Sequence, residues 1–256
     1  MKNRGISYIV SVRGRRDMFP GFIRNIKEYN EDFEIIFCCQ DDNLLFRKGQ
    51  LANLGYKKAK KDLISFINID FRFLEFVPIV EEMNKIDAPV ITFLYAAKVR
   101  EGKDGKLLET TQRGKSQTPG GCQVFTRNQF ERCGGHTNLI MGWGIDDVVV
   151  NYRVKQFSKF RYLPYCMGHV EHDKFVEYPR REYVKGRNTT VAMNPPSDPK
   201  FDSFMETIAE ESGKTVLEDN VFEFKFRNIG VPDNFVEMKR YKEQLAMERD
   251  VLNLRN

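Results

Sequence analysis

Two adjacent carboxylates follow a glycine-flanked tryptophan near the middle of the chain. Asp146 and Asp147 come shortly after Gly142-Trp143-Gly144, which contains the only tryptophan of the sequence. Glycine on both sides of a bulky ring permits backbone angles that other residues avoid, so this loop can move or approach a ligand closely. One carboxylate can accept a proton while its neighbour binds a hydroxyl group. The structural alternative, Asp146 as a helix cap, leaves Asp147 without a role.

Three arginines follow the first apolar run of the chain. Arg13, Arg15 and Arg16 come directly after residues 6–12, whose composition is typical of a buried strand. Guanidinium groups at the carboxyl end of a strand suit a phosphate or a nucleobase carbonyl. A solvated basic turn is the commoner role of such a cluster and stays open as the alternative.

A carboxylate and two histidines are candidate metal ligands. Asp70 ends the apolar run 63–69, where a carboxylate can hold a divalent ion against a diphosphate. His169 and His172, two of the three histidines, follow a later apolar run. Imidazole with carboxylate and phosphate oxygens favours Mn²⁺ over Mg²⁺. The alternatives are a turn-forming aspartate and solvated histidines, whereas zinc is disfavoured because Cys166 gives no standard four-ligand spacing.

Apolar runs that alternate with amphipathic stretches must position these side chains. The pattern predicts strands over 6–12, 33–39, 63–69, 90–96, 121–126 and 160–166, and helices over 17–29, 48–60, 78–86, 127–133 and 146–157. This alternation predicts an α/β fold with a mainly parallel central sheet flanked by helices, and ligands at the carboxyl ends of the strands. The polar, glycine-containing stretch 98–119 is expected to form a hairpin or a loop over a site.

The pattern weakens in the last quarter of the chain. Prolines at 195, 196 and 199 mark an irregular stretch, and a closing helix is predicted from Asp233 to residue 254. We therefore expect a domain over 1–187 and a mostly helical C-terminal extension over 188–256 that packs on the same domain. No internal repeat or low-complexity tract is present in the sequence.

Composition limits the class of protein. The 256 residues are 41% hydrophobic and 12% aromatic, which is typical of a packed globule. The net charge of +5 suits a phosphorylated ligand but is too small for a nucleic-acid-binding stripe. Five scattered cysteines indicate reduced thiols and a cytoplasmic protein. No apolar run is long enough for a signal peptide or a transmembrane segment, and the oligomeric state stays open.

The order of these motifs resembles the GT-A glycosyltransferases, most closely the β-1,4-galactosyltransferase group and related polysaccharide-synthesising transferases. The resemblance covers about residues 6–173. Arg13-Gly14-Arg15 resembles the arginine pair that contacts the nucleotide in that family. Phe46 and Lys48 resemble its Phe-x-Arg element, with lysine in place of arginine, ahead of a Leu-x-Asn-x-Gly helix. Gly121, with the glycine before it, resembles the pair that lines the donor site.

The resemblance also implies a metal site. Asn68-Ile69-Asp70 stands where the family has its Asp-x-Asp motif. Asp70 keeps the metal-binding acid, whereas Asn68 can bond a ribose but carries no charge. Residues 169–172 resemble the family's Met-x-x-His element, which makes His172 the stronger ligand candidate and His169 the weaker. The implied cofactor is Mn²⁺ or another divalent cation.

Residues 142–147 resemble the family's Gly-Trp-Gly-Gly-Glu-Asp signature. The resemblance implies that Trp143 contacts the donor sugar and the acceptor, that Asp146 binds an acceptor hydroxyl and that Asp147 is the catalytic base. The implied activity is metal-dependent, inverting transfer of a sugar from a nucleotide sugar, a UDP-sugar first, to a hydroxyl of a glycan. The alternative is a nucleotide- or glycan-binding module without turnover, which the uncharged Asn68 favours.

Overall fold

The computed structural model describes residues 5–42, 46–84, 90–102, 105–115, 121–138, 146–172 and 209–227, except for the side chains of Asp146, Asp147, Val148, Tyr152 and Gln156. The elements are β1 (Ile6–Val12), the 3-10 helix η1 (Arg16–Met18), α1 (Phe19–Tyr29), β2 (Phe33–Gln40), α2 (Lys48–Lys58), β3 (Leu63–Ile67), β4 (Phe71–Phe73), α3 (Ile79–Asn84), β5 (Val90–Glu101), β6 (Leu107–Glu109), β7 (Gly114–Lys115), β8 (Cys122–Thr126), α4 (Arg127–Arg132), α5 (Asp146–Phe157), β9 (Phe160–Val170), β10 (Glu210–Glu218) and β11 (Val221–Arg227). None of the described helices is long and apolar enough to cross a membrane.

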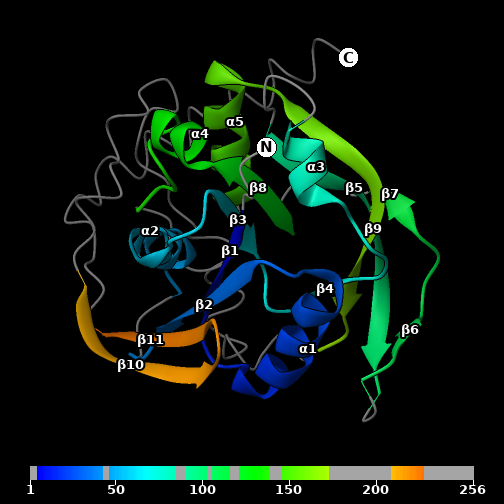
Figure 1. The fold of residues 1–256 in the computed structure, drawn as a ribbon, viewed down its shortest axis with the longest axis horizontal. Coiled ribbons are helices and arrows are strands. Elements are labelled where there is room, and N and C mark those ends of the chain that lie inside the picture. The colour runs from blue at the N-terminus through cyan, green and yellow to red at the C-terminus, as the bar shows by residue number, and fades with distance from the viewer. Residues whose placement is uncertain are drawn as a thin grey trace, which may run out of the picture.

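The strands form one mixed sheet in the order β10-β11-β2-β1-β3-β8-β5-β9-β4, with β6 and β7 paired to β5 (Figure 1). The prediction of an α/β fold is confirmed, but the prediction of a mainly parallel sheet is wrong. β1 runs parallel to β2 and β3, whereas β8 runs antiparallel to both β3 and β5. Alternating apolar runs cannot report this reversal, because an antiparallel central strand is as apolar as a parallel one.

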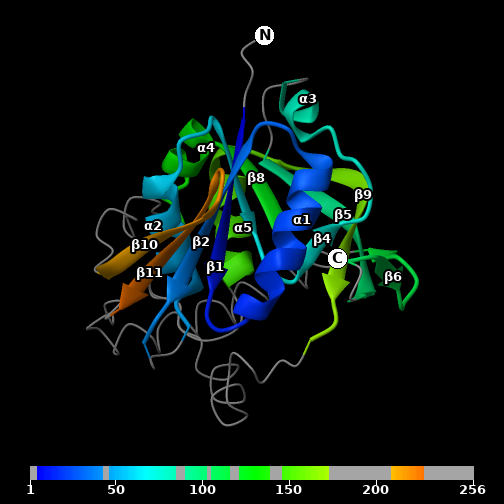
Figure 2. The same ribbon diagram turned by 60° about the horizontal axis from the view of Figure 1, so that its bottom comes forward.

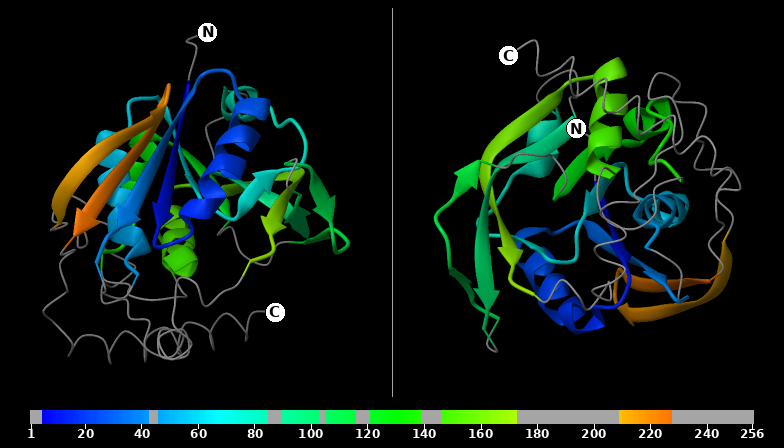
Figure 3. Two further views of the ribbon diagram at one scale, coloured as in Figure 1. Left: turned by 90° about the horizontal axis from the view of Figure 1, so that it is seen from below. Right: turned by 180° about the vertical axis from the view of Figure 1, so that it is seen from behind.

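Helices cover both faces of the sheet, so its central strands are buried on both sides. Tyr8 and Val10 of β1 pack in the core cluster with Phe22 and Ile26 of α1, whereas Ile9 points into the cluster on the other face. The second cluster contains residues of α2, α4 and α5. Figures 2 and 3 show α1 on one face and these three helices on the other. This alternation follows the period of two along a strand.

The stretch 98–119 contains the expected hairpin. β5 continues to Glu101, beyond its predicted end, and β6 and β7 pair with it antiparallel. β9 likewise continues to Val170, pairing parallel with β5 and antiparallel with β4. These long strands carry the chain from the centre of the sheet to the region of the candidate metal ligands.

The described part of the C-terminal region is a β-hairpin and does not support a mostly helical extension. β10 and β11 pair antiparallel, and β11 pairs parallel with β2, which extends the main sheet. The sequence of β11, VFEFKFR, alternates aromatic and charged residues with the period of a strand. The helix predicted over 233–254 lies outside the described residues, and the domain boundary after 187 stays a prediction.

Candidate functional site

Asp70 lies in a tight turn between β3 and β4. The amide of Phe71 donates to the carbonyl of Asn68 at 3.0 Å, which closes the turn, and the amide of Asn68 donates to the carbonyl of Gly121 at 3.1 Å. The amide of Val170, at the end of β9, donates to the carbonyl of Asp70 at 2.7 Å. Backbone bonds to the residue before β8 and from the end of β9 therefore fix the turn, and Asp70 is 8% exposed.

The two predicted histidine ligands converge on this carboxylate. His169 pairs with Phe71 in the register of β9 and β4, and its Nε2 lies 3.2 Å from Asp70 Oδ2. His172, just beyond β9, places its Nε2 2.9 Å from the same oxygen. The three donor atoms all lie within 4.8 Å of one another. The structure brings these three candidate ligands together, although about 100 positions separate Asp70 from the histidines, and their role as metal ligands stays a prediction.

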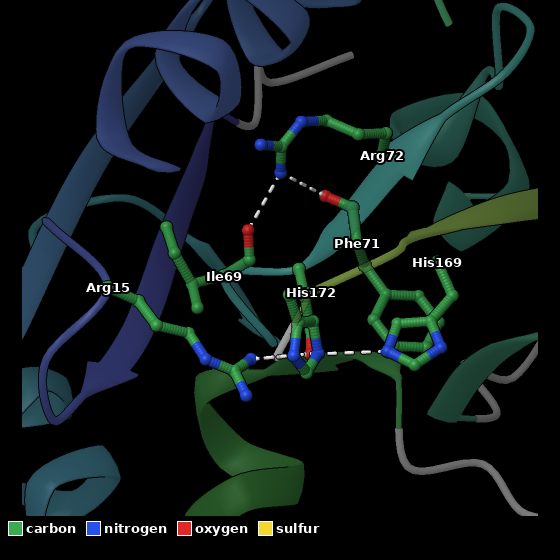
Figure 4. A network of polar contacts seen from close by, with 7 residues as sticks. Arg15, Ile69, Phe71, Arg72, His169 and His172 are labelled. Carbon is green, nitrogen blue, oxygen red and sulfur yellow. Dashed lines mark hydrogen bonds and ion pairs between the residues drawn. The ribbon is translucent and has the colours of Figure 1, made fainter. Parts of the chain in front are cut away.

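Arg15 reaches the same cluster from the end of β1 (Figure 4). Its Nη1 donates to Asp70 Oδ2 at 2.9 Å and lies 3.0 Å from His172 Nε2. Gly14 and Arg15 both have positive φ values, 71° and 51°. A non-glycine residue in the left-handed region costs about 1 kcal/mol, so the surrounding contacts must hold Arg15 in this conformation.

The surroundings of Asp70 favour its ionised form. Burial raises the pKa of the carboxyl group, but hydrogen bonds from His169 and His172 and the positive charge of Arg15 outweigh burial and hold the pKa far below its usual range. The side chains of Arg15 and Asp70 are 7% and 12% exposed, so solvent screens this ion pair only weakly. The turn therefore presents a buried carboxylate anion at neutral pH.

The cluster has the chemistry of a site for a divalent transition metal ion. One carboxylate oxygen and two imidazole nitrogens are ligands that suit Mn²⁺. Two atoms at the cluster, Asp70 Oδ1 and His172 Nδ1, are buried and form no hydrogen bond with the described part of the chain. Buried polar atoms are rarely left unpaired, so these residues fit an additional ligand.

Phe71, which the sequence analysis missed, orients His169. The two rings stack with centroids 5.2 Å apart and an interplanar angle of 22°. Gly121 also lies against the Phe71 ring, since a Cβ added to it would be 2.3 Å from the nearest ring atom. Gly121 was predicted to line the donor site; its observed contact is with Phe71, which in turn contacts a candidate metal ligand.

The remaining predicted donor contacts lie near the ends of the same strands. Arg13 is half-buried in the bend after β1, and Asn68 is half-buried in the turn of Asp70. Phe46 is 6% exposed and packs in the core cluster of α2. Lys48 begins α2, and its carbonyl accepts a hydrogen bond from Ser11 Oγ at 3.0 Å.

The predicted catalytic residues are only partly described. α5 begins at Asp146, as the sequence pattern predicts, so Asp146 and Asp147 form its first turn. Their side chains, and Trp143 with its flanking glycines, lie outside the described residues, so their roles stay predictions.

Arg47 and Arg72 are among the buried arginines that the sequence analysis missed. Arg47, 2% exposed, has its Nε and Nη1 atoms buried without a hydrogen bond to the described residues, and burial lowers its pKa to about 10. Arg72 is fully buried in β4 and bonds to the turn of Asp70. Nothing in the sequence distinguishes them from surface arginines, because the residue type is the same and the spacing of the neighbouring residues does not indicate burial.

The sequence matches no protein-family model and no curated protein, but the fold is similar to several solved structures. A mutant of Drosophila β-1,4-galactosyltransferase 7 in complex with manganese, UDP-Gal and xylobiose aligns with a TM-score of 0.58 at 14% identity, covering 92% of this chain and 98% of that chain. The catalytic domain of the same Drosophila enzyme with xylobiose aligns with a TM-score of 0.55 at 15% identity, with the same coverage. GalNAc-T7 with UDP, GalNAc and Mn²⁺ aligns with a TM-score of 0.51 at 12% identity, covering 78% of this chain and 50% of that chain. Over most of its length, the chain is therefore structurally similar to GT-A glycosyltransferases.

Proposed function

We propose that this protein is a metal-dependent, inverting glycosyltransferase that moves a sugar from a nucleotide sugar, a UDP-sugar first, to a hydroxyl group of a glycan. The observation that carries this proposal is the convergence of His169 and His172 on one carboxylate oxygen of Asp70. The proposal is also supported by the solved structures of similar fold that hold manganese with UDP-Gal, or Mn²⁺ with UDP.

The donor diphosphate would lie across the carboxyl ends of β1 and β3, which are neighbouring parallel strands. Arg13 and Arg15 follow β1 and would offer guanidinium groups to its oxygens, with Lys48 at the start of α2. Asn68 would bond the ribose. A divalent ion held by Asp70, His169 and His172 would supply Lewis-acid stabilisation of the charge that develops on the departing diphosphate.

The transfer step is assigned to the first turn of α5. Asp147 accepts the proton of the acceptor hydroxyl while that oxygen bonds to the anomeric carbon and the bond to the diphosphate breaks. The attack is in line, so the configuration at the anomeric carbon inverts, and no carboxylate nucleophile is needed. Asp146 holds the acceptor hydroxyl, and Trp143 on its glycine-flanked loop excludes water that would hydrolyse the donor.

The test is release of free nucleotide from a panel of UDP- and GDP-sugars, with Mn²⁺ and a broad panel of glycan acceptors. Asp147→Asn should reduce acceptor-dependent release by at least about a thousandfold while donor binding stays within a few-fold of wild type. Asp70→Asn should weaken donor binding as well, because it removes a metal ligand. Near-normal turnover by Asp147→Asn would contradict the assignment of the base.

A binding module without turnover is the second candidate, and the uncharged Asn68 is the observation that favours it. Thermal unfolding with UDP and Mn²⁺ separates the two functions. A rise in melting temperature that requires both ligands, together with no nucleotide release for any donor and acceptor pair, would assign the module instead of the enzyme.

A further inference from the structure

Arg72 is a fully buried arginine next to the candidate metal site, and its hydrogen bonds in the described structure go to backbone carbonyls and to Glu101. It lies in the middle of β4, where its backbone pairs with Gly168 of β9. Its guanidinium is directed back over the turn that precedes it (Figure 4). A buried guanidinium is costly unless its donors are satisfied. Both terminal nitrogens of Arg72 form hydrogen bonds, whereas its Nε is buried without a hydrogen bond to the described residues, so the bonds of the terminal nitrogens identify what Arg72 holds.

The guanidinium bonds both sides of Asp70. Nη1 donates to the carbonyl of Ile69 at 2.7 Å and to the carbonyl of Phe71 at 2.9 Å. These carbonyls belong to the residues directly before and after Asp70. A single nitrogen therefore bonds the Ile69–Asp70 peptide group and the Phe71–Arg72 peptide group, one before and one after the candidate metal-binding residue.

The other nitrogen of the fork reaches the loop that carries Arg15. Nη2 donates to the carbonyl of Met18 at 3.4 Å, and the amide of Met18 in turn donates to the carbonyl of Arg15 at 3.1 Å. Nη2 also pairs with Glu101 Oε2 at 3.0 Å, at the end of β5. Arg72 thus links the turn of Asp70 with the loop of Arg15 through one rigid, planar group.

The position of Arg72 is itself fixed. Its guanidinium carbon lies 5.6 Å from the centre of the Phe22 ring of α1. On the next residue, Phe73, both backbone polar groups bond to the side-chain amide of Asn25, at 2.8 and 2.9 Å. α1 therefore holds β4 in place, and the fork of Arg72 cannot shift without moving the turn.

We propose that Arg72 is a positioning residue of the metal and donor site, which sets the distance and orientation of Asp70 relative to Arg15. This inference rests on the proposed function, because it takes the Asp70 cluster as the metal site. Arg72 acts through the backbone carbonyls of Ile69, Phe71 and Met18. Lysine cannot replace it, because a single ammonium group cannot span both sets of acceptors.

A purely stabilising role is the competing explanation, and Arg127 provides a matched control. Its guanidinium also bonds two backbone carbonyls, those of Ala59 and Lys61, at the opposite end of β3 from Asp70. Loss of either guanidinium should lower the free energy of unfolding. Only loss of Arg72 should change the metal site.

The experiment compares Arg72→Met, Arg72→Lys and Arg127→Met in the full chain. Affinity for Mn²⁺ is measured by electron paramagnetic resonance of the free ion, and stability by urea unfolding. The metal-free imidazole signals are followed by ¹H–¹³C NMR, since the chain has three histidines and His136 serves as an internal reference. We expect both Arg72 variants to lose Mn²⁺ affinity by about tenfold or more and to shift the signals of His169 and His172.

Each outcome decides a different point. Mn²⁺ affinity within threefold of wild type in a folded Arg72 variant, or unmoved His169 and His172 signals, overturns the positioning role. An equal loss of affinity in Arg127→Met overturns it as well, because the effect is then one of stability. If Arg72→Met does not fold, Arg72→Lys decides. If wild type binds no Mn²⁺, the proposed function loses its metal, and the imidazole signals alone decide the role of Arg72.

Discussion

At the scale of single residues, the proposed divalent cation would compete with Arg15 for one carboxylate. Arg15 Nη1 lies 2.9 Å from Asp70 Oδ2, and both side chains are buried. Replacing Arg15 with Gln removes a positive charge next to the ligands, so Mn²⁺ should bind more tightly in the absence of nucleotide, by roughly tenfold. The metal-free variant should lose about 3 kcal/mol of unfolding free energy, because the buried Asp70 then lacks its counter-charge.

Titration calorimetry with Mn²⁺ and urea unfolding with and without the ion measure both effects. Arg16→Gln is the matched control: this neighbour is half exposed and pairs with Glu223, away from the cluster. It should leave Mn²⁺ affinity unchanged. If Arg15→Gln binds Mn²⁺ no better than wild type, the guanidinium and the ion occupy separate places.

The chemistry of the site was predictable from residue types, whereas its supporting contacts were not. Asp70, His169 and His172 stand out in the sequence because carboxylate and imidazole are metal ligands and histidine is rare in this chain. Arg72 does not stand out, because its role depends on burial and on which carbonyls surround it. Arg47 is comparable, because its guanidinium is buried and the sequence motif pointed only to its neighbours Phe46 and Lys48.

At the scale of elements, the turn before β4, the start of β8 and the end of β9 form one packed junction. Gly121 lies against Phe71, and Phe71 stacks on His169. A methyl group at Gly121 would lie 2.3 Å from the Phe71 ring, so the ring must move and His169 with it. Gly121→Ala should therefore weaken Mn²⁺ binding by about tenfold.

Gly114→Ala is the control for this prediction, since a Cβ there meets no atom within 4 Å and Gly114 has an ordinary φ. Mn²⁺ affinity of both variants is compared with their midpoints of urea unfolding. Equal affinities in the two variants would contradict the coupling of Gly121 to His169.

The order of strands and helices was predictable, but strand direction and the short strands were not. Long apolar runs mark β1, β2, β3 and β8, because these strands are buried on both faces. β4 has only three residues, too few for a periodic pattern, and its strand geometry comes from pairing with β9. The alternation in β11 was legible, yet the closing helix predicted over 233–254 led us to expect a mostly helical extension.

At the scale of the whole molecule, the sheet brings residues from its first loop and from the end of β9 to one site while burying every thiol. Cys38 and Cys39 are neighbours in β2 but belong to core clusters on opposite faces of the sheet. Burial raises the pKa of Cys122 to about 12 and that of Cys133 to about 11. Cys166 is also buried, and its pKa is raised.

Thiolate, not thiol, attacks disulfide reagents, so these raised pKa values and the burial predict unreactive cysteines in the native protein. At pH 8, native protein should react with 5,5′-dithiobis(2-nitrobenzoate) only as fast as it unfolds, whereas in guanidinium chloride all five cysteines should react at once. The thiols lie on both faces of one sheet, and we expect both faces to become exposed in the same unfolding event. The labelling rates of the thiols should therefore be similar to one another and equally sensitive to urea. Rapid native labelling of a single thiol would show that one face of the sheet opens independently of the other.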